Sequence, residues 1–391
     1  MISIRCLIRL KIQDLITMNL VNSSIMKCLL VCLFVVHKGV AEDSNVDFVV
    51  ETAGQYDSPW AIEFLPDNRI LLSEMKGSLK LLDSDGSLLG EVTGVPEVAF
   101  GGQGGLGDVV LHPDFEKNRG VYLSYAEEGP NKTFGAAVAR GNLELTETGG
   151  QLNDLEVIWR QVPKVKGRGH YGHRIVFGPD NYLWISSGER QKFEPAQDME
   201  SNLGKVVRLY SSGSTVEDNP FGSANPVTSE IWSLGHRNPL GLSFDISGRL
   251  WTVEMGPKGG DELNLVRRGS NYGYPVVSNG DHYSGEEIPD HETRHEYSPP
   301  AITWDKVISP SSMLVYDGGE FPKWKGNAFI GGLSSKAIVR VSFDGDNARE
   351  VERLDMGFRV RDVEQGPDGG VWVLEDGRRG SGKLFKLTRR K

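Results

Sequence analysis

The stretch IVFGPDNYLWISSGE at residues 175–189 joins two short apolar runs through a Pro-Asp-Asn turn. Short apolar runs on either side of a tight turn predict two antiparallel strands. The pattern recurs as AIEFLPDNRILLSEMKGSLKLL at 61–82, VVLHPDFEKNRGVYLSYA at 109–126, LSFDISGRLWTVEMG at 242–256, KGNAFIGGLSSKAIVRVSF at 325–343 and VEQGPDGGVWVLEDG at 363–377. Each copy predicts a strand, a turn and a second strand.

Six related units, spaced by roughly 60 residues, are typical of a β-propeller. The sequence therefore predicts an all-β fold, a six-bladed β-propeller that forms one domain over residues 42–391. A pair of β-sandwiches also contains short strands, but it does not explain six related turns. We expect VDFVVE at 46–51 to complete the final blade, and the Pro- and Gly-rich region 278–303 to be a long inserted loop.

Residues 1–41 have the pattern of a leader. Met26-Lys27 is followed by an apolar run at 28–36 and by the small residues Gly39-Val40-Ala41. A basic start, a short apolar run and a small-residue cleavage site predict a secretory signal peptide. The apolar run is shorter than the roughly 20 residues that span a bilayer, although a membrane anchor is the alternative interpretation. We expect a secreted or periplasmic protein with no membrane insertion after the leader is removed.

The predicted domain is acidic and contains no cysteine. The chain has 43 Lys and Arg and 53 Asp and Glu; five and one of these lie in residues 1–41, which leaves a net charge of −14. Cys6, Cys28 and Cys32 all lie in the leader, so no disulfide, thiolate nucleophile or zinc-thiolate site is expected in the domain. The acidity disfavours nucleic acid and anionic membranes as partners. An anionic ligand would require a local cluster of arginines.

Four polar loops are candidates for a binding site, because loops from all blades of a propeller meet at one end of its central channel. They are GGQGGLGD at 101–108, GRGHYGHR at 167–174, GHRNPLG at 235–241 and MGPKGGDELN at 255–264, which leads into NYGYP at 271–275. In the first loop we expect the glycines to clear space around Gln103. Buried His and Arg often satisfy only backbone carbonyls, but four such loops in one chain favour a ligand site.

These loops resemble those of the soluble quinoprotein sugar dehydrogenases, the glucose/sorbosone dehydrogenase family. The matching stretches run from residue 58 to about 375 and are SPWAIEFLPD, GGQGGLGDVVLHPDF, GHYGHRIVFGPD, LGHRNPLGL, LWTVEMGPKGGDELNLV, NYGYP and RVRDVEQGPDG. The succession of GHRNP and EMGPKGGDELN is specific, whereas the Pro-Asp-Gly turns are not. The resemblance implies a six-bladed propeller that uses pyrroloquinoline quinone (PQQ) and calcium.

The resemblance also implies roles for individual residues. It makes His170 the general base, and it places six side chains against the quinone: Gln103, Arg237, Asn238, Tyr283, Arg359 and Arg361. The carbonyls of Gly256 and Pro257 would bind the catalytic calcium, and Glu262 with the Tyr272 carbonyl would match a second, structural calcium. These residue types suit the cofactors, since arginines bind carboxylates in a bidentate manner and calcium prefers oxygen ligands.

The implied reaction is the oxidation of an aldose at its anomeric carbon to an aldonolactone. Neutral His170 removes the proton of the anomeric hydroxyl, the hydride passes to the quinone, and calcium with Arg237 stabilises the negative charge that develops. The electrons then pass to an acceptor that these motifs do not identify.

The chain departs from the family pattern at two positions. His173 occupies a place where the family usually has a small residue, so a second imidazole narrows the pocket or competes with His170 as the base. A lysine that contacts the quinone in some members has only Lys336 as its counterpart, about two residues out of step.

Two short motifs have less weight. His291-Glu-Thr-Arg-His295 spells the HExxH zinc-protease pattern, but that pattern requires a helix. Here prolines and charged residues flank it, which predicts a solvated loop. Asn131-Lys-Thr133 is a glycosylation sequon that has meaning only in a eukaryotic secretory pathway.

Two other functions remain open at this point. A calcium-dependent lactonase would need carboxylates and Asn around the metal, whereas these loops favour Arg. A non-enzymatic extracellular propeller that binds carbohydrate or protein would retain the fold with a vestigial quinone pocket.

Overall fold

The computed structural model describes residues 48–222, 224–378 and 380–390, and nearly all of the regular structure in them is β. The helices are short: α1 (Phe115–Asn118), α2 (Pro226–Glu230) and the 3-10 turns η1 (Pro130–Lys132), η2 (Glu194–Ala196), η3 (His291–Thr293) and η4 (Pro322–Trp324). The predicted all-β class is therefore confirmed. The predicted leader lies outside the described residues. Within those residues, every helix is too short to cross a bilayer.

Four sheets have four strands each, and a fifth has eight. The four-stranded sheets are β1 (Phe48–Asp57), β24 (Ser381–Arg389), β23 (Val371–Glu375), β22 (Val360–Gln365); β10 (Gly172–Phe177), β11 (Leu183–Ser187), β12 (Lys205–Leu209), β13 (Ile231–Leu234); β14 (Pro239–Phe244), β15 (Leu250–Glu254), β16 (Asp261–Leu265), β17 (Ile302–Trp304); and β18 (Pro310–Val315), β19 (Ala328–Gly332), β20 (Ala337–Asp344), β21 (Asn347–Asp355).

The eight-stranded sheet consists of two antiparallel groups of four. The groups are β2 (Pro59–Phe64), β3 (Ile70–Glu74), β4 (Ser78–Leu82), β5 (Leu88–Thr93) and β6 (Leu106–Leu111), β7 (Gly120–Gly129), β8 (Thr133–Thr146), β9 (Gly149–Arg160). Their outermost strands, β5 and β9, pair in parallel from Glu91 opposite Gly149 to Thr93 opposite Gln151. This parallel pairing between outer strands joins two groups that are otherwise built like the other sheets.

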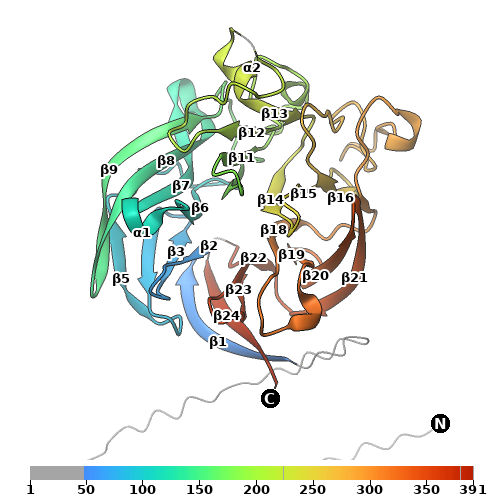
Figure 1. The fold of residues 1–391 in the computed structure, drawn as a ribbon. Helices are drawn as coiled ribbons and strands as arrows, with labels where there is room; N and C mark the ends of the chain where they lie inside the picture. The colour runs from blue at the N-terminus through green and yellow to red at the C-terminus, as the bar shows by residue number, and fades with distance from the viewer. Residues whose placement is uncertain (1–47, 223, 379, 391) are drawn as a thin grey trace, which may run out of the picture. The chain divides into compact units, whose positions relative to one another are not determined.

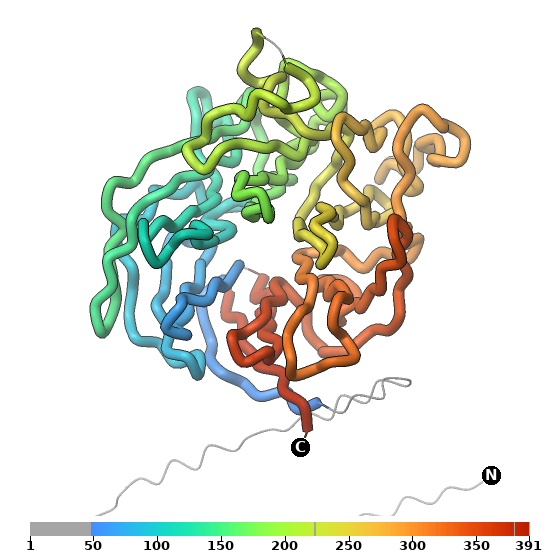
Figure 2. Tube along the Cα trace, in the orientation of Figure 1, coloured from blue at the N-terminus to red at the C-terminus, as the bar shows by residue number. Residues whose placement is uncertain are grey.

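The sheets are arranged around a common centre (Figure 1). One edge strand of each group faces this centre, and each of these inner strands contacts the next in a closed cycle: β2, β6, β10, β14, β18, β22 and again β2. The first and last described strands meet in one sheet, because β1 pairs with β24 from Phe48 opposite Arg389 to Asp57 opposite Ser381. Figure 2 shows the same closure as a blue segment beside a red one. The predicted pairing of the N-terminal strand with the last sheet is confirmed for residues 48–51.

The recurring turns have the geometry that their sequence predicts. Asn68 donates its backbone N–H to the Leu65 carbonyl at 2.9 Å, and Asn181 donates to the Gly178 carbonyl at 2.9 Å. Both asparagines have positive φ, 70° and 62°, which Asn adopts more readily than most residues. Most of region 278–303 is an insertion, as predicted, because residues 266–301 connect β16 and β17, which pair with each other; the last two residues of the predicted loop belong to β17.

Apolar side chains fill the spaces between neighbouring sheets. Trp372 on β23 and Leu384 on β24 pack against Ile62 on β2 and Leu72 on β3. These contacts fill the space between the sheet that contains β1 and the first group of strands. These side chains are almost fully removed from water, and such burial is the main stabilising contribution to the fold.

A buried arginine joins the inner strands. Arg174 on β10 contacts each of the other five through Leu240 O (2.9 Å), Ser311 O (3.0 Å), Asp108 (3.2 Å), Asp362 (2.8 Å) and the face of Trp60 (4.3 Å from the ring centroid). We call this group the channel cluster. Its guanidinium is neutralised by two carboxylates and is hydrogen bonded on every nitrogen, as a buried charge requires.

Candidate active site

The structure brings the four predicted loops together. Loops 101–108, 167–174 and 235–241 lead into the inner strands β6, β10 and β14, and the loop at 255–264 follows β15. Hydrogen bonds connect them in sequence, since Gln103 N donates to Arg168 O at 2.7 Å and Gly172 N donates to Asn238 Oδ1 at 3.3 Å. Met255 N completes the series by donating to Asn238 O at 3.3 Å. Residues from different sheets thus form one site.

His170 is held on two sides within this site. Its backbone N–H donates to Gln103 Oε1 at 2.7 Å, and its Nδ1 forms a very short hydrogen bond with the Glu189 carboxylate. Its backbone has a φ of 48°, in the left-handed region that histidine seldom adopts. These contacts fix both the position and the direction of the imidazole.

The protonation states of this pair suit a general base. Burial lowers the pKa of His170, and Arg237 and Arg190 lower it further, against the opposing effect of Glu189. Burial raises the pKa of Glu189, but its hydrogen bonds outweigh that effect and the net shift is downward. An ionised carboxylate only accepts hydrogen bonds, so Nδ1 carries the proton and Nε2 carries the lone pair. His170 is therefore neutral near pH 7 and can accept a proton at Nε2.

Glu189 is a functional candidate that the sequence reasoning did not find. Besides contacting His170, its other carboxylate oxygen accepts hydrogen bonds from the backbone amides of Lys192 and Phe193. Nothing in the sequence near His170 identifies it, because the two residues are 19 positions apart. The available signal was a carboxylate directly after a buried strand, β11, in the stretch Ser187-Gly188-Glu189.

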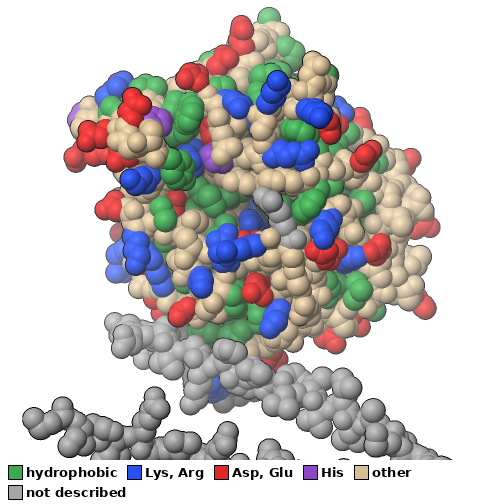
Figure 3. All heavy atoms as spheres, turned by 180° about the vertical axis from the view of Figure 1, so that it is seen from behind, with side chains coloured by type: hydrophobic (Ala, Val, Ile, Leu, Met, Phe, Trp, Pro, Cys, Tyr) green, Lys and Arg blue, Asp and Glu red, His purple; other side chains and the backbone are tan. Residues whose placement is uncertain are grey.

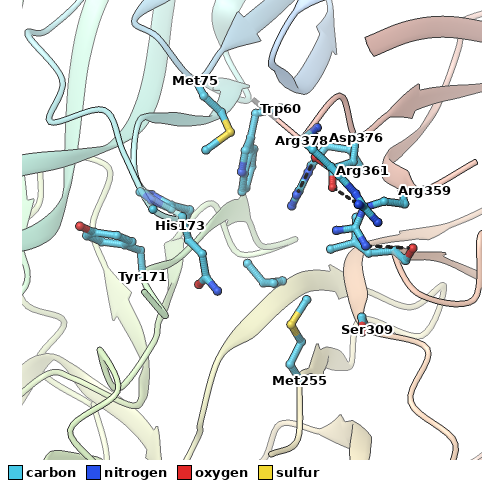
Figure 4. A pocket seen from close by; sticks show the side chains of 14 residues that line it. Trp60, Met75, Tyr171, His173, Met255, Ser309, Arg359, Arg361, Asp376 and Arg378 are labelled. Carbon is cyan, nitrogen blue, oxygen red and sulfur yellow. Dashed lines mark hydrogen bonds and ion pairs between the residues drawn. The ribbon is translucent and has the colours of Figure 1, made fainter. Parts of the chain in front are cut away.

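Two neighbours of His170, Tyr171 and its hydrogen-bond partner Gln103, line a pocket of about 460 Å³, whereas His170 itself is not among the lining residues. Figure 4 shows its side chains, with aromatic and methionine groups on one part of the wall and arginines on another. The lining residues are Trp60, Met75, Gly102, Gln103, Tyr171, His173, Leu240, Met255, Ser309, Leu333, Arg359, Arg361, Asp376 and Arg378. Three predicted quinone contacts, Gln103, Arg359 and Arg361, are among them.

Three of the predicted quinone contacts carry buried hydrogen-bond donors that have no partner in the part of the chain that the structure describes. These are Arg237 Nε, Asn238 Nδ2 and Arg361 Nε. Arg237 is otherwise anchored, because its Nη1 donates to Met255 O at 2.9 Å and to Gly256 O at 2.6 Å. Its backbone N–H donates to the buried Glu254 at 2.6 Å. Unpaired buried donors are costly unless a ligand satisfies them, so they favour a binding role.

Asp376 organises the arginines on one wall of the pocket. Its carboxylate pairs with Arg359 Nε at 2.8 Å and with Arg361 Nη2 at 3.2 Å. Burial raises the pKa of Asp376, but the two arginines outweigh burial and lower it, so the carboxylate is ionised. Asp376 and Arg378 were not predicted from the sequence.

Tyr283 lies apart from the lining residues. Its side chain is exposed (75%), and its ring centroid is 5.9 Å from the guanidinium carbon of Arg237. The structure therefore places it next to a predicted quinone contact, on the outer side of the site.

The predicted metal ligands occupy two places. Gly256 and Pro257 are buried, and Gly256 O accepts a hydrogen bond from Arg237 at 2.6 Å. Glu262 lies beside Glu254, and the amide of Asn264 donates to both at 3.0 Å while its own Oδ1 has no donor. Burial, with the charge of Glu254, raises the pKa of Glu262 well above its usual value. In residues 48–222, 224–378 and 380–390, no three His, Cys, Asp or Glu side chains converge as a metal site.

Two glycines of loop 101–108 lie close to aromatic rings, and their role around Gln103 stays a prediction. A Cβ at Gly104 would lie 2.9 Å from the Tyr171 ring, and one at Gly107 would lie 3.0 Å from the His173 ring. His173 is 3% exposed, stacks on Tyr171 with centroids 5.1 Å apart, and has no hydrogen bond at either ring nitrogen. Burial lowers the pKa of His173 to about 3, so it is neutral.

The expectation that the HETRH segment is a solvated loop is wrong for His291. This residue is 5% exposed, and its Nε2 donates to the Tyr272 carbonyl at 3.0 Å while its Nδ1 is 3.1 Å from Asn279 Oδ1. Both partners lie in the same connection between β16 and β17, so packing within this connection removes His291 from water although its sequence neighbours are polar. The segment forms only the three-residue turn η3, so it lacks the helix that a zinc-protease motif needs.

The chain is similar to known sugar dehydrogenases. A sequence model of the family described as Glucose / Sorbosone dehydrogenase matches residues 56–386. Aldose sugar dehydrogenase YliI of Escherichia coli is 40% identical over 342 residues, which cover 85% of this chain and 91% of the relative. Quinoprotein glucose dehydrogenase B of Acinetobacter calcoaceticus is 29% identical over 421 residues, 86% of each chain.

Solved structures show the same likeness. The soluble aldose sugar dehydrogenase of Escherichia coli in its apo form superposes with a TM-score of 0.83 at 40% identity, covering 88% of this chain and all of the other. The PQQ-bound aldose sugar dehydrogenase of Streptomyces coelicolor superposes with a TM-score of 0.72 at 26% identity, covering 89% and 100%. The chain therefore belongs to the glucose/sorbosone dehydrogenase family.

Proposed function

We propose that this protein is an exported oxidoreductase that oxidises the anomeric hydroxyl of aldose sugars to the lactone, with PQQ as hydride acceptor and calcium as Lewis acid. The observation that carries the proposal is a set of buried donors on Arg237, Asn238 and Arg361 that have no partner among the described residues. Arg361 lines the pocket of about 460 Å³, and the other two residues are hydrogen bonded to its lining residue Met255. The names of the relatives, two aldose sugar dehydrogenases and a quinoprotein glucose dehydrogenase, support the same chemistry.

We also infer that the fold is a six-bladed propeller with residues 42–391 as its single domain. The closed cycle of six inner strands supports this count, provided that the eight-stranded sheet is counted as two blades joined by the β5–β9 pairing. The relatives have dehydrogenase folds that superpose over nearly the whole chain. The leader pattern at 1–41 supports export to the periplasm or the medium.

One wall of the pocket carries Arg359, Arg361 and Asp376, and we call it the arginine wall. Its chemistry fits the quinone. PQQ carries three carboxylates, and guanidinium groups bind carboxylates more strongly than neutral donors do. Arg359 and Arg361 line the pocket, while Gln103 and Asn238 offer amide groups on the side of His170. Tyr283 would cover the outer side of the ligand next to Arg237.

The oxygen-rich places fit calcium. The Gly256 and Pro257 carbonyls belong to the turn that Arg237 holds, and Gly256 O retains a second lone pair for a cation. At the second place, the Glu262 carboxylate, the unpaired Asn264 Oδ1 and the nearby Tyr272 carbonyl supply oxygens, and a bound cation would offset the charge of Glu262 beside Glu254. When bound, the quinone supplies the hydride acceptor and calcium the Lewis acid.

His170 supplies the proton chemistry. Its Nε2 accepts the proton of the sugar hydroxyl, while Glu189 holds the imidazole through Nδ1 and stabilises the imidazolium that results. The donors of Arg237 favour negative charge nearby, because they are rigidly held and shielded from water.

One experiment tests the proposal. Purified protein is freed of metal and quinone, then PQQ and calcium are added, and dye reduction is followed with a panel of aldoses. We expect sugar-dependent dye reduction that requires both additions, together with a rise in Tm from ligand binding. Absence of any Tm shift at tens of micromolar PQQ would refute the dehydrogenase and favour a propeller that only binds carbohydrate or protein. Hydrolysis of a lactone with calcium alone would indicate the lactonase.

A further inference from the structure

The arginine wall contains a third guanidinium group besides those of Arg359 and Arg361. Arg378 lines the same pocket, on the side where Figure 4 shows Asp376 between the arginines. Its guanidinium has no hydrogen-bond or ion-pair partner among residues 48–222, 224–378 and 380–390. By contrast, Arg359 and Arg361 both pair with Asp376. Arg378 is therefore the cation on this wall with its full hydrogen-bonding capacity available.

The position of Arg378 is fixed by the same carboxylate. Its backbone N–H donates to Asp376 Oδ1 at 3.2 Å, and Asp376 N donates to Arg359 O at 2.8 Å. Arg378 also has a φ of 48°, a conformation that costs a non-glycine residue free energy. The backbone that presents Arg378 is thus tied to the backbone that presents Arg359.

The charges on this wall do not cancel. Three guanidinium groups face one carboxylate, which leaves two net positive charges in the wall of a pocket within an acidic protein. Figure 3 shows a comparable contrast over one face of the molecule, with Lys and Arg side chains near its middle and many Asp and Glu side chains toward its rim. A ligand with at least two carboxylates matches this excess, whereas a neutral sugar does not.

We infer that Arg378 binds a carboxylate of the quinone, as a third cation of the cofactor pocket; this rests on the proposed function. The alternative cation is Lys336, the only counterpart of the lysine that contacts the quinone in some relatives. The structure leaves Lys336 exposed and outside the pocket lining. Arg378, in the loop after β23, thus contributes to the pocket the positive charge that Lys336 does not.

The test compares PQQ binding to full-length Arg378→Gln, Lys336→Gln and wild-type protein in the presence of calcium, by quenching of intrinsic fluorescence. We expect Arg378→Gln to weaken PQQ about tenfold, near the lower end for a hydrogen bond between charged groups because Arg378 is exposed. Lys336→Gln should stay within about twofold of the wild type, since an exposed charge outside the pocket is screened by salt. Arg349→Gln, which removes an exposed charge on the outer strand β21, is the matched control.

Salt dependence gives a second readout. The difference between the wild type and Arg378→Gln should shrink as salt rises from about 0.02 M to about 0.5 M, because screening weakens a charge contact but not a change of shape. An equal Tm of the two proteins without PQQ excludes misfolding as the cause.

The outcomes separate this inference from the proposed function. Failure of the wild type to bind PQQ would remove the function and, with it, the inference. Binding by the wild type with unchanged affinity in Arg378→Gln would overturn the inference alone. A loss in Lys336→Gln with none in Arg378→Gln would assign the third cation to Lys336.

Discussion

The channel cluster and the pocket both contain buried arginines, but they differ in how completely these are paired. Arg174 has a partner for every guanidinium nitrogen and contacts all the other inner strands. Arg237 and Arg361 each retain an unpaired Nε. A buried polar group that is fully satisfied stabilises the fold, whereas one that is left unsatisfied is prepared for a ligand. Buried arginines can therefore have two different roles, one in stabilising the fold and one in binding a ligand.

The largest expected effect is on the pocket side. Replacing His170 by Gln removes the base but keeps a polar side chain of similar size, so kcat should fall by roughly 10²- to 10⁴-fold. Affinity for PQQ and the free energy of unfolding should change little. Steady-state kinetics with saturating PQQ and calcium, together with urea unfolding, measure both.

His173 provides the control for this assignment. His173→Gly should mainly change KM or the sugar preference, because it restores the small residue of the family and leaves His170 with its Glu189 contact. An inactive His173→Gly protein and an active His170→Gln protein would show that the base is misassigned.

The second largest effect is on the channel side. Replacing Arg174 by Met leaves Asp108 and Asp362 buried without their cation, which should lower the free energy of unfolding by about 3–5 kcal/mol. Arg237→Met removes a guanidinium that donates to two backbone carbonyls and forms no salt bridge within the described residues, and should cost less than half as much. Urea unfolding followed by tryptophan fluorescence measures both variants. Equal losses would contradict the distinction between the two groups of arginines.

The pH dependence of stability sharpens the same contrast. Burial raises the pKa of Asp108 to about 6 although Arg174 opposes the shift. The folded protein therefore holds this proton more tightly than the unfolded chain, and the associated stability, present below about pH 4, is lost as pH rises through 6. The total is at most roughly 3 kcal/mol. The Asp108→Asn variant should lose less stability than the wild type between pH 4 and pH 7, as measured by urea unfolding at each pH.

The smallest expected effect is again on the pocket. Arg361→Gln should weaken PQQ by roughly 10- to 100-fold, because a hydrogen bond between charged groups is lost, while the free energy of unfolding changes by less than about 1 kcal/mol. Fluorescence titration with PQQ and calcium measures the affinity. A large loss of stability with unchanged affinity would place Arg361 with the structural arginines.

Local sequence patterns predicted the strands and turns, because each strand-turn-strand unit is a short-range feature of about 15 residues. The closure of β1 with β24 followed from the number of units. The partners of the site residues did not follow, since Glu189 and Asp376 meet His170 and Arg361 only through the fold. The channel cluster was missed for the same reason. His291 was misjudged because burial of a loop depends on what it folds against, not on its polar neighbours.

The pairing of β1 with β24 has a consequence for how the protein is made. The first sheet receives its outer strand from residues 48–57 and its other three strands from the last 30 residues or so of the chain. A growing chain therefore cannot complete this sheet until residues 360–389 have been made, and until then β1 exposes an unpaired edge. A circularly permuted protein would have β24 and β1 in one hairpin and its new ends in an exposed turn. Such a protein would be free of that delay.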